Sequence, residues 1–123
     1  MPAQTRRPRE AGSVTAETAV LLPVLLVVLA AAVGVLACVA AQLRCVDAAR
    51  AAARVAARGD APALVQSTGA RLAPADARVR VRSGGGTVEV VVSARVRPFG
   101  PALRLPAVAV QGRAVAAVEP GAA

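Results

Sequence analysis

Histidine, lysine, tryptophan and tyrosine are all missing from this chain, which has one phenylalanine and two cysteines among its 123 residues. With no histidine and two cysteines, a single chain cannot assemble the usual four-ligand zinc site. Nucleophile–base pairs that use histidine are excluded as well. The seven acidic residues are scattered and show no catalytic pairing. We therefore expect no enzyme activity, no metal, no cofactor and no small-molecule substrate.

The 15 basic residues are all arginine and give the chain a net charge of +8. Such a charge suits nucleic-acid binding, but proteins that bind single strands normally stack aromatic side chains on the bases. Phe99 is the one aromatic residue here. Nucleic acid is therefore not the expected partner, and only a mode that contacts phosphates alone stays open.

A stretch without charge runs from Thr18 to Leu43, and its core is almost entirely alanine, valine and leucine. As a helix, the core from Ala19 to Ala41 is roughly 35 Å long, which is enough to span the apolar part of a bilayer. A chain this small cannot enclose such a helix on all sides. We therefore expect a transmembrane helix over residues 13–43.

Two features inside this helix bear on its shape and packing. Pro23 removes one backbone donor and predicts a kink. Ala30, Gly34 and Cys38 recur every four residues and predict a stripe of small side chains for close contact with another helix.

Strong helix formers continue past the apolar run, so the helix is expected to extend over residues 44–59 and to end at Gly59. Asp60 is expected to cap a second, short helix that starts at Pro62. Cys45 is expected at the outer membrane interface, where pairing with another chain is one alternative.

Alternating valines then predict three strands over residues 78–82, 87–97 and 107–118, with a glycine turn between the first two. The predicted fold class is α+β: a long N-terminal transmembrane helix extended past the membrane, followed by a small three-stranded antiparallel sheet. Glu89 is expected to oppose an arginine of the first strand.

A glutamate stands at the start of the apolar run, in the segment Gly12-Ser13-Val14-Thr15-Ala16-Glu17, and Arg6, Arg7 and Arg9 precede it. A carboxylate at the edge of a bilayer is costly and usually functional. This segment resembles the processing site of type IV prepilins, in which a basic leader is removed after a glycine and the fifth mature residue is glutamate. The stretches GSVTAETAVLLPVLLVVL and CVDAARAAARVAARGD are similar to the TadE-like proteins, minor pilins of the Flp (tight adherence) pilus system.

The resemblance implies a leader over residues 1–12 and cleavage between Gly12 and Ser13 by a membrane-embedded prepilin peptidase. Glu17 would then pair with the freed amine of Ser13, in its own chain or a neighbouring one, and set the register of assembly. The implied partners are the membrane, the peptidase, and other pilins or Tad assembly proteins. The protein would be a single-pass protein of the cytoplasmic membrane, or part of an extracellular pilus, with residues 60–123 as a small extracytoplasmic domain.

Two alternatives stay open. The four arginines between Arg44 and Arg58 outnumber the three in the leader, and this count favours the opposite orientation. A single-pass protein with an inward-facing basic domain would bind anionic lipid or nucleic acid. The other alternative is an ordinary secreted protein cleaved near Ala41, although the apolar run is longer than the usual signal sequence.

Overall fold

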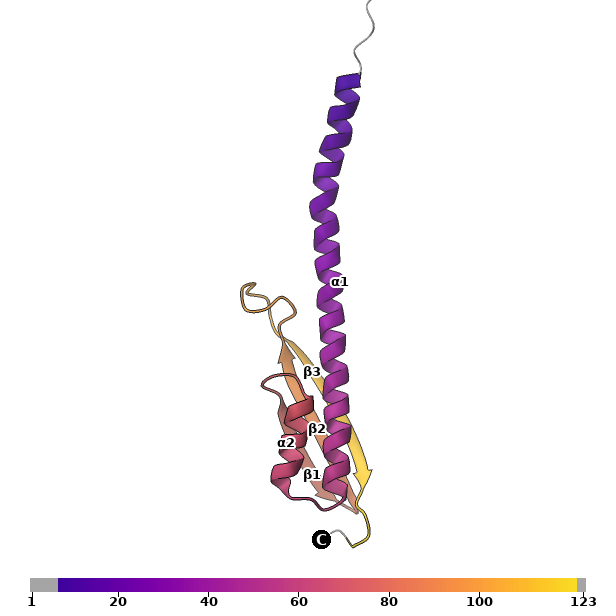
Figure 1. Cartoon of the computed structure of the whole chain (residues 1–123), viewed down its shortest axis with the longest axis vertical. Coiled ribbons are helices and arrows are strands. Elements are labelled where there is room, and N and C mark those ends of the chain that lie inside the picture. Colours follow the sequence, from indigo (N-terminus) through magenta and orange to yellow (C-terminus); the bar gives the residue numbers. More distant parts are fainter. Residues whose placement is uncertain (1–6, 122–123) are drawn as a thin grey trace, which may run out of the picture. The chain divides into compact units, whose positions relative to one another are not determined.

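The computed structural model describes the backbone of residues 7–121 and the side chains of residues 12–121. Five elements follow one another along the chain: α1 (Arg7–Ala57), α2 (Pro62–Leu72), β1 (Arg78–Gly84), β2 (Thr87–Val96) and β3 (Val108–Ala117) (Figure 1). The strands form one antiparallel sheet in the order β1-β2-β3. The predicted fold class is confirmed. The first six residues of the predicted leader, Arg6 among them, lie outside the described residues.

The chain divides into two compact units, one that ends at Gly34 and one that begins at Val35, and α1 contributes to both. In the first unit the large apolar side chains, from Val14 to Val33, are each more than half exposed. A helix that is apolar on all sides needs lipid or other helices around it. The helix that contains this segment is long and apolar enough to cross a membrane, which is consistent with single-pass anchoring or with a signal sequence. The helix continues through Pro23, and the kink stays a prediction.

The core of the second unit is built from small side chains of α1 and from valines of β2. Alanines recur on one face of α1 with helical spacing, and the even-numbered residues of β2 alternate inward as the two-residue period of a strand requires. The helix supplies Ala41, Cys45, Ala48, Ala49, Ala52, Ala53 and Val55, and β2 supplies Val88, Val90, Val92 and Ala94. Val65 of α2, Ala73 just after α2 and Val110 of β3 complete the core. Because these side chains are short, the helix lies directly on the sheet.

Helix α1 approaches the sheet closely at Gly112 of β3. A Cβ atom at this position would overlap the backbone of Cys45 and Val46, so glycine alone fits. One turn earlier on α1, the Gln42 side chain pairs with the backbone of Gln111: its amide donates to the Gln111 carbonyl, and its oxygen accepts from the Gln111 N–H at 3.0 Å. Since β3 is an edge strand, this pair also satisfies backbone groups that the sheet leaves open.

The predicted hairpin between β1 and β2 is confirmed. Gly85 and Gly86 form its two-residue turn with φ of +61° and +76°, which only glycine adopts easily at both positions. The register places Glu89 opposite Arg82, as expected. The ion pair, however, joins Glu89 to Arg113 of β3, whose Nη2 lies 2.8 Å from Oε2.

At the end of α1, the structure confirms the predicted role of Gly59 but not that of Asp60. Helix α1 ends at Ala57, and Gly59 follows with φ of +79° and donates to the Ala56 carbonyl at 3.0 Å. The prediction that Asp60 caps α2 is wrong, because the cap position is Ala61 and no side chain bonds the helix start. The carboxylate of Asp60 instead accepts from Nε of Arg58 at 3.4 Å. Pro62, which needs no N–H partner, begins the helix without a cap.

Substitution of Gly112 tests the contact between α1 and β3. We expect Gly112→Ala to destabilise the second unit by about 1–3 kcal/mol, because the added Cβ forces the backbones apart. Gly84→Ala is the control, since a Cβ there meets nothing within 4 Å. The readout is the rate at which a maleimide labels Cys45, fully buried in the native fold, in a Cys38→Ala background. Equal protection in both glycine variants would contradict the contact.

A pH titration tests the Glu89–Arg113 pair. The hydrogen bond from Arg113, assisted by the charges of Arg113 and Arg82, outweighs partial desolvation and holds the pKa of the Glu89 carboxyl below its usual value. Because this pKa is lower in the folded than in the unfolded chain, the pair stabilises the fold above about pH 4.3 and loses its effect as the pH falls through the folded pKa.

We therefore expect Tm to fall between pH 6 and pH 3 by less in Glu89→Gln than in the unmodified chain. Glu119→Gln is the control, because Glu119 is exposed near the end of the chain. If Tm fell as much in Glu89→Gln as in the unmodified chain, the Glu89–Arg113 pair would not contribute to the pH dependence of stability.

Candidate functional site

The candidate processing site lies in the first turns of α1. The bond between Gly12 and Ser13 sits five residues after the helix start at Arg7. Nothing lies within 4 Å of the point that a Gly12 Cβ would occupy, and Ser13 is exposed. The bond is therefore open to approach from outside, but it is helical. A peptidase would have to unwind this turn, and helix ends are where local opening costs least.

Glu17 follows Ser13 by four residues, so both side chains lie on the same face of α1. The carboxylate is exposed, and it is the only charged group between Glu10 and Arg44. The two ion pairs found among residues 12–121, Arg58–Asp60 and Arg113–Glu89, do not involve it. Its neighbour Thr18 is satisfied within the helix, since its hydroxyl donates to the Val14 carbonyl at 2.9 Å. Glu17 is thus the acidic group that this helix carries into its apolar stretch.

The other predicted site residues are spread along α1. Pro23 and Ala30 are exposed, Gly34 is buried and Cys38 is half-buried. Their four-residue spacing is as the sequence predicts, but the structure contains one chain, and the packing stripe stays a prediction.

Cys45 differs from its expected position. The structure places its side chain in the core with no exposed surface, beside Gly112, rather than at an accessible interface. The signal for this was in the sequence: Ala41, Ala48 and Ala49 lie four before, three after and four after Cys45, on one helix face. A disulfide to another chain would require this core to open.

Comparison with known proteins finds a matching family model and a similar protein. The model of the TadE-like protein family matches residues 12–54, from Gly12 to the alanines that pack on the sheet. A protein of Mycobacterium tuberculosis described as apoptosis inhibitor Rv3655c is 35% identical over 105 residues, which cover 85% of this chain and 78% of that protein. No solved structure matches the chain.

The family match covers the segment in which the candidate site residues lie, and the similarity to the mycobacterial protein extends over most of both chains. The TadE-like family is a structural, pilus-related family rather than a family of enzymes, and it is implicated in Tad pilus assembly. The chain belongs to the TadE-like protein family.

Proposed function

We propose that this protein is a minor pilin or assembly subunit of a Tad pilus, anchored by α1 and cleaved after Gly12 by a prepilin peptidase. The observation that carries the proposal is Glu17. It is a lone carboxylate at the start of an exposed apolar helix, four residues after the proposed new N-terminus, in a family implicated in Tad pilus assembly.

The anchoring step rests on exposed apolar surface. From Val20 to Val39, the large apolar side chains of α1 are about half exposed or more. These 20 residues would be about 30 Å long, which matches the hydrocarbon thickness of a bilayer. Core burial begins at Ala41. The proposed span is therefore bounded by Glu17 at one end and by the folded domain at the other.

The proposed cleavage depends on the glycine at position 12 and creates a new charge on Ser13. Glycine at position 12 weakens the helix by about 1 kcal/mol relative to alanine and leaves no side chain to obstruct the peptidase. Hydrolysis of the Gly12–Ser13 bond would remove the leader and leave an ammonium group on Ser13, one turn before the Glu17 carboxylate.

The pairing step follows from that new charge. A carboxylate near the hydrocarbon is costly without a partner, and the ammonium of Ser13 supplies one. If the amine belongs to a neighbouring subunit, the attraction in low dielectric fixes the axial position of one α1 against the next. Glu17 would then act in assembly and not in cleavage.

The packing of α1 argues against ordinary secretion with cleavage near Ala41. Ala41 is 7% exposed, and the side-chain amide of Gln42 is hydrogen-bonded to β3 through both its nitrogen and its oxygen. Cleavage there would cut the helix where it begins to hold the sheet. The four exposed arginines after the apolar stretch favour the inward-facing alternative: Arg44, Arg50, Arg54 and Arg58. Determining the N-terminal residue of the native protein distinguishes this alternative from the pilin proposal.

The first test of the proposal is the N-terminus of the protein from its native membrane, read by intact mass and terminal peptide sequencing. We expect Ser13. In Gly12→Leu, the bulky side chain should block cleavage and leave the leader attached, whereas Ala16→Leu, also exposed on α1, should be cut normally. An unmodified chain that starts at Met1, Pro2 or Gln42 would refute the processing step.

The second test separates assembly from cleavage. We expect Glu17→Gln to be cleaved but to enter isolated pili or cross-linked pilin complexes about tenfold less, the effect of losing roughly 1.4 kcal/mol. The matched control is Thr18→Val, which removes the hydroxyl bond to Val14 but no charge. Normal incorporation of Glu17→Gln would show that the carboxylate does not set the register.

A further inference from the structure

The sheet face opposite α1 is strongly basic. Because the even-numbered residues of β2 point to the core, the paired register places the even-numbered residues of β1 and the odd-numbered residues of β2 and β3 on the other face. Five arginines lie there: Arg78, Arg80, Arg82, Arg95 and Arg113. The acidic residue among them, Glu89, is paired with Arg113.

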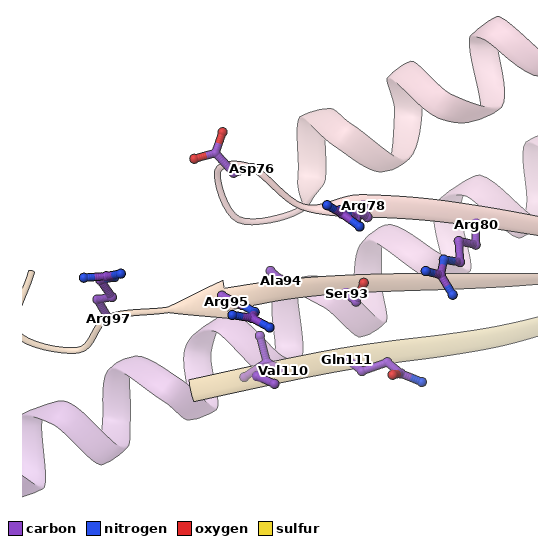
Figure 2. A pocket seen from close by; sticks show the side chains of 10 residues that line it. Asp76, Arg78, Arg80, Ser93, Ala94, Arg95, Arg97, Val110 and Gln111 are labelled. Carbon is purple, nitrogen blue, oxygen red and sulfur yellow. The ribbon is translucent and has the colours of Figure 1, made fainter. Parts of the chain in front are cut away.

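Four arginines surround a shallow groove of about 820 Å³ at one end of this face. Arg78 and Arg80 come from β1, Arg95 from β2, and Arg97 from the start of the loop that follows β2. Figure 2 shows Ser93 between the guanidinium groups of Arg78, Arg80 and Arg95, with the carboxylate of Asp76 turned away from them. Neither ion pair found in the described part of the chain involves these four arginines. The groove is therefore a place of uncompensated positive charge.

The contacts between α1 and β3 show which end of the sheet this is. Gln42 bonds Gln111, Cys45 meets Gly112, and the Glu119 N–H donates to the Ala57 carbonyl at 3.0 Å. Both elements therefore run in the same direction, and within the second unit the start of β3 lies toward the earliest residues of α1, from Val35 to Val39. The register places Arg95 opposite Ala109, within this starting segment of β3.

The different rise of strand and helix brings this end beside the apolar surface. From Gln111 back to Val108 is about 10 Å along the strand, which equals roughly seven residues of helix. Counted back from Gln42, this reaches Val35. Val35, Leu36 and Val39 are 65%, 67% and 49% exposed. The start of β3 thus lies level with apolar side chains that need lipid.

The loop of residues 97–107, which joins β2 to β3, projects from the same end (Figure 1). It carries two exposed leucines, Leu103 and Leu105, at 54% and 49% exposure, together with the exposed Arg97 and Arg104. Apolar tips flanked by arginines are typical of surfaces that enter the headgroup layer of a membrane.

We propose that this end of the sheet is a lipid-binding surface for the bilayer that α1 spans. Arg78, Arg95 and Arg97 bind the phosphates of anionic phospholipids, which a guanidinium group can hold through two hydrogen bonds. Leu103 and Leu105 enter the layer below the headgroups. The proposal rests on the anchoring step of the proposed function but not on cleavage, and it applies to either orientation.

Nucleic acid fits this surface less well. Nucleic acid would contact the arginines, but its binding would not explain why the leucines are exposed or why the groove lies level with exposed apolar residues of α1. The loop also offers one half-buried aromatic residue, Phe99, for stacking.

The test uses the absence of native tryptophan. Leu103→Trp introduces a single reporter into the full chain, which is placed in phosphatidylcholine nanodiscs with or without 30% phosphatidylglycerol, and quenching by a lipid spin-labelled near the headgroup is measured. We expect stronger quenching with phosphatidylglycerol. Arg95→Glu with Arg97→Glu should abolish the increase, because each arginine near an anionic surface strengthens attachment about fivefold.

The matched control is Arg50→Glu with Arg54→Glu, which reverses the same number of exposed charges on α1, away from the groove. It should keep the increase. Equal quenching in both lipids, an equal loss in the control, or displacement of the reporter from the lipid by added duplex DNA would overturn the proposal. A separate reporter, Leu25→Trp, reports anchoring. If a deep spin label fails to quench it, the proposed function fails as well. If it is quenched and the loop reporter is not, only the lipid-binding proposal fails.

Discussion

The contact on which the second unit depends is the close approach of α1 to β3 at Gly112. A sheet with one aromatic residue in the whole chain cannot bury much surface with large side chains, so it must exclude water by bringing backbones together. Alanines on α1 and glycine on β3 permit this distance, and the two-way bond between Gln42 and Gln111 closes the strand edge beside it. Cys45 lies at the centre of the contact, which explains its complete burial.

This arrangement gives one helix two kinds of surroundings. Up to Val39, its large apolar side chains are exposed and suit lipid or neighbouring helices. From Ala41 onward, one face of the same helix is the wall of a protein core. Glu17 stands where the apolar stretch begins, and the sheet is attached where it ends. In the proposed function, the first part anchors and assembles while the second holds the domain beside the membrane.

Much of this fold could be predicted from the sequence, because it rests on periodicity. Alternating valines predicted the inward face of β2, adjacent glycines predicted the hairpin, and Gly59 predicted the helix end. Sequence patterns gave wrong or no predictions where a residue's role depends on another residue that it contacts. Asp60 looked like a cap, but Arg58 binds its carboxylate and Pro62 starts α2. Cys45 looked accessible because the sequence does not say what covers an alanine face, and the role of Gly112 depends on a contact 67 residues away along the chain. The processing residues, Gly12, Ser13 and Glu17, were found from a resemblance, and their roles in cleavage and assembly stay predictions.

The most direct measurement is a spin-label scan along α1 in lipid nanodiscs, with single cysteines introduced into a background of Cys38→Ala and Cys45→Ala. Accessibility to oxygen and to a water-soluble nickel complex distinguishes lipid, water and protein surroundings. We expect oxygen-accessible positions from Val20 to Leu36, positions with reduced access to both reagents at the half-buried Ala51 and Ala56, and nickel-accessible positions at Arg50 and Arg54. The change should fall between Val39 and Arg44. Nickel access throughout Val20–Leu36, or lipid contact that continues past Arg54, would contradict a helix that passes from the bilayer into the core of the domain.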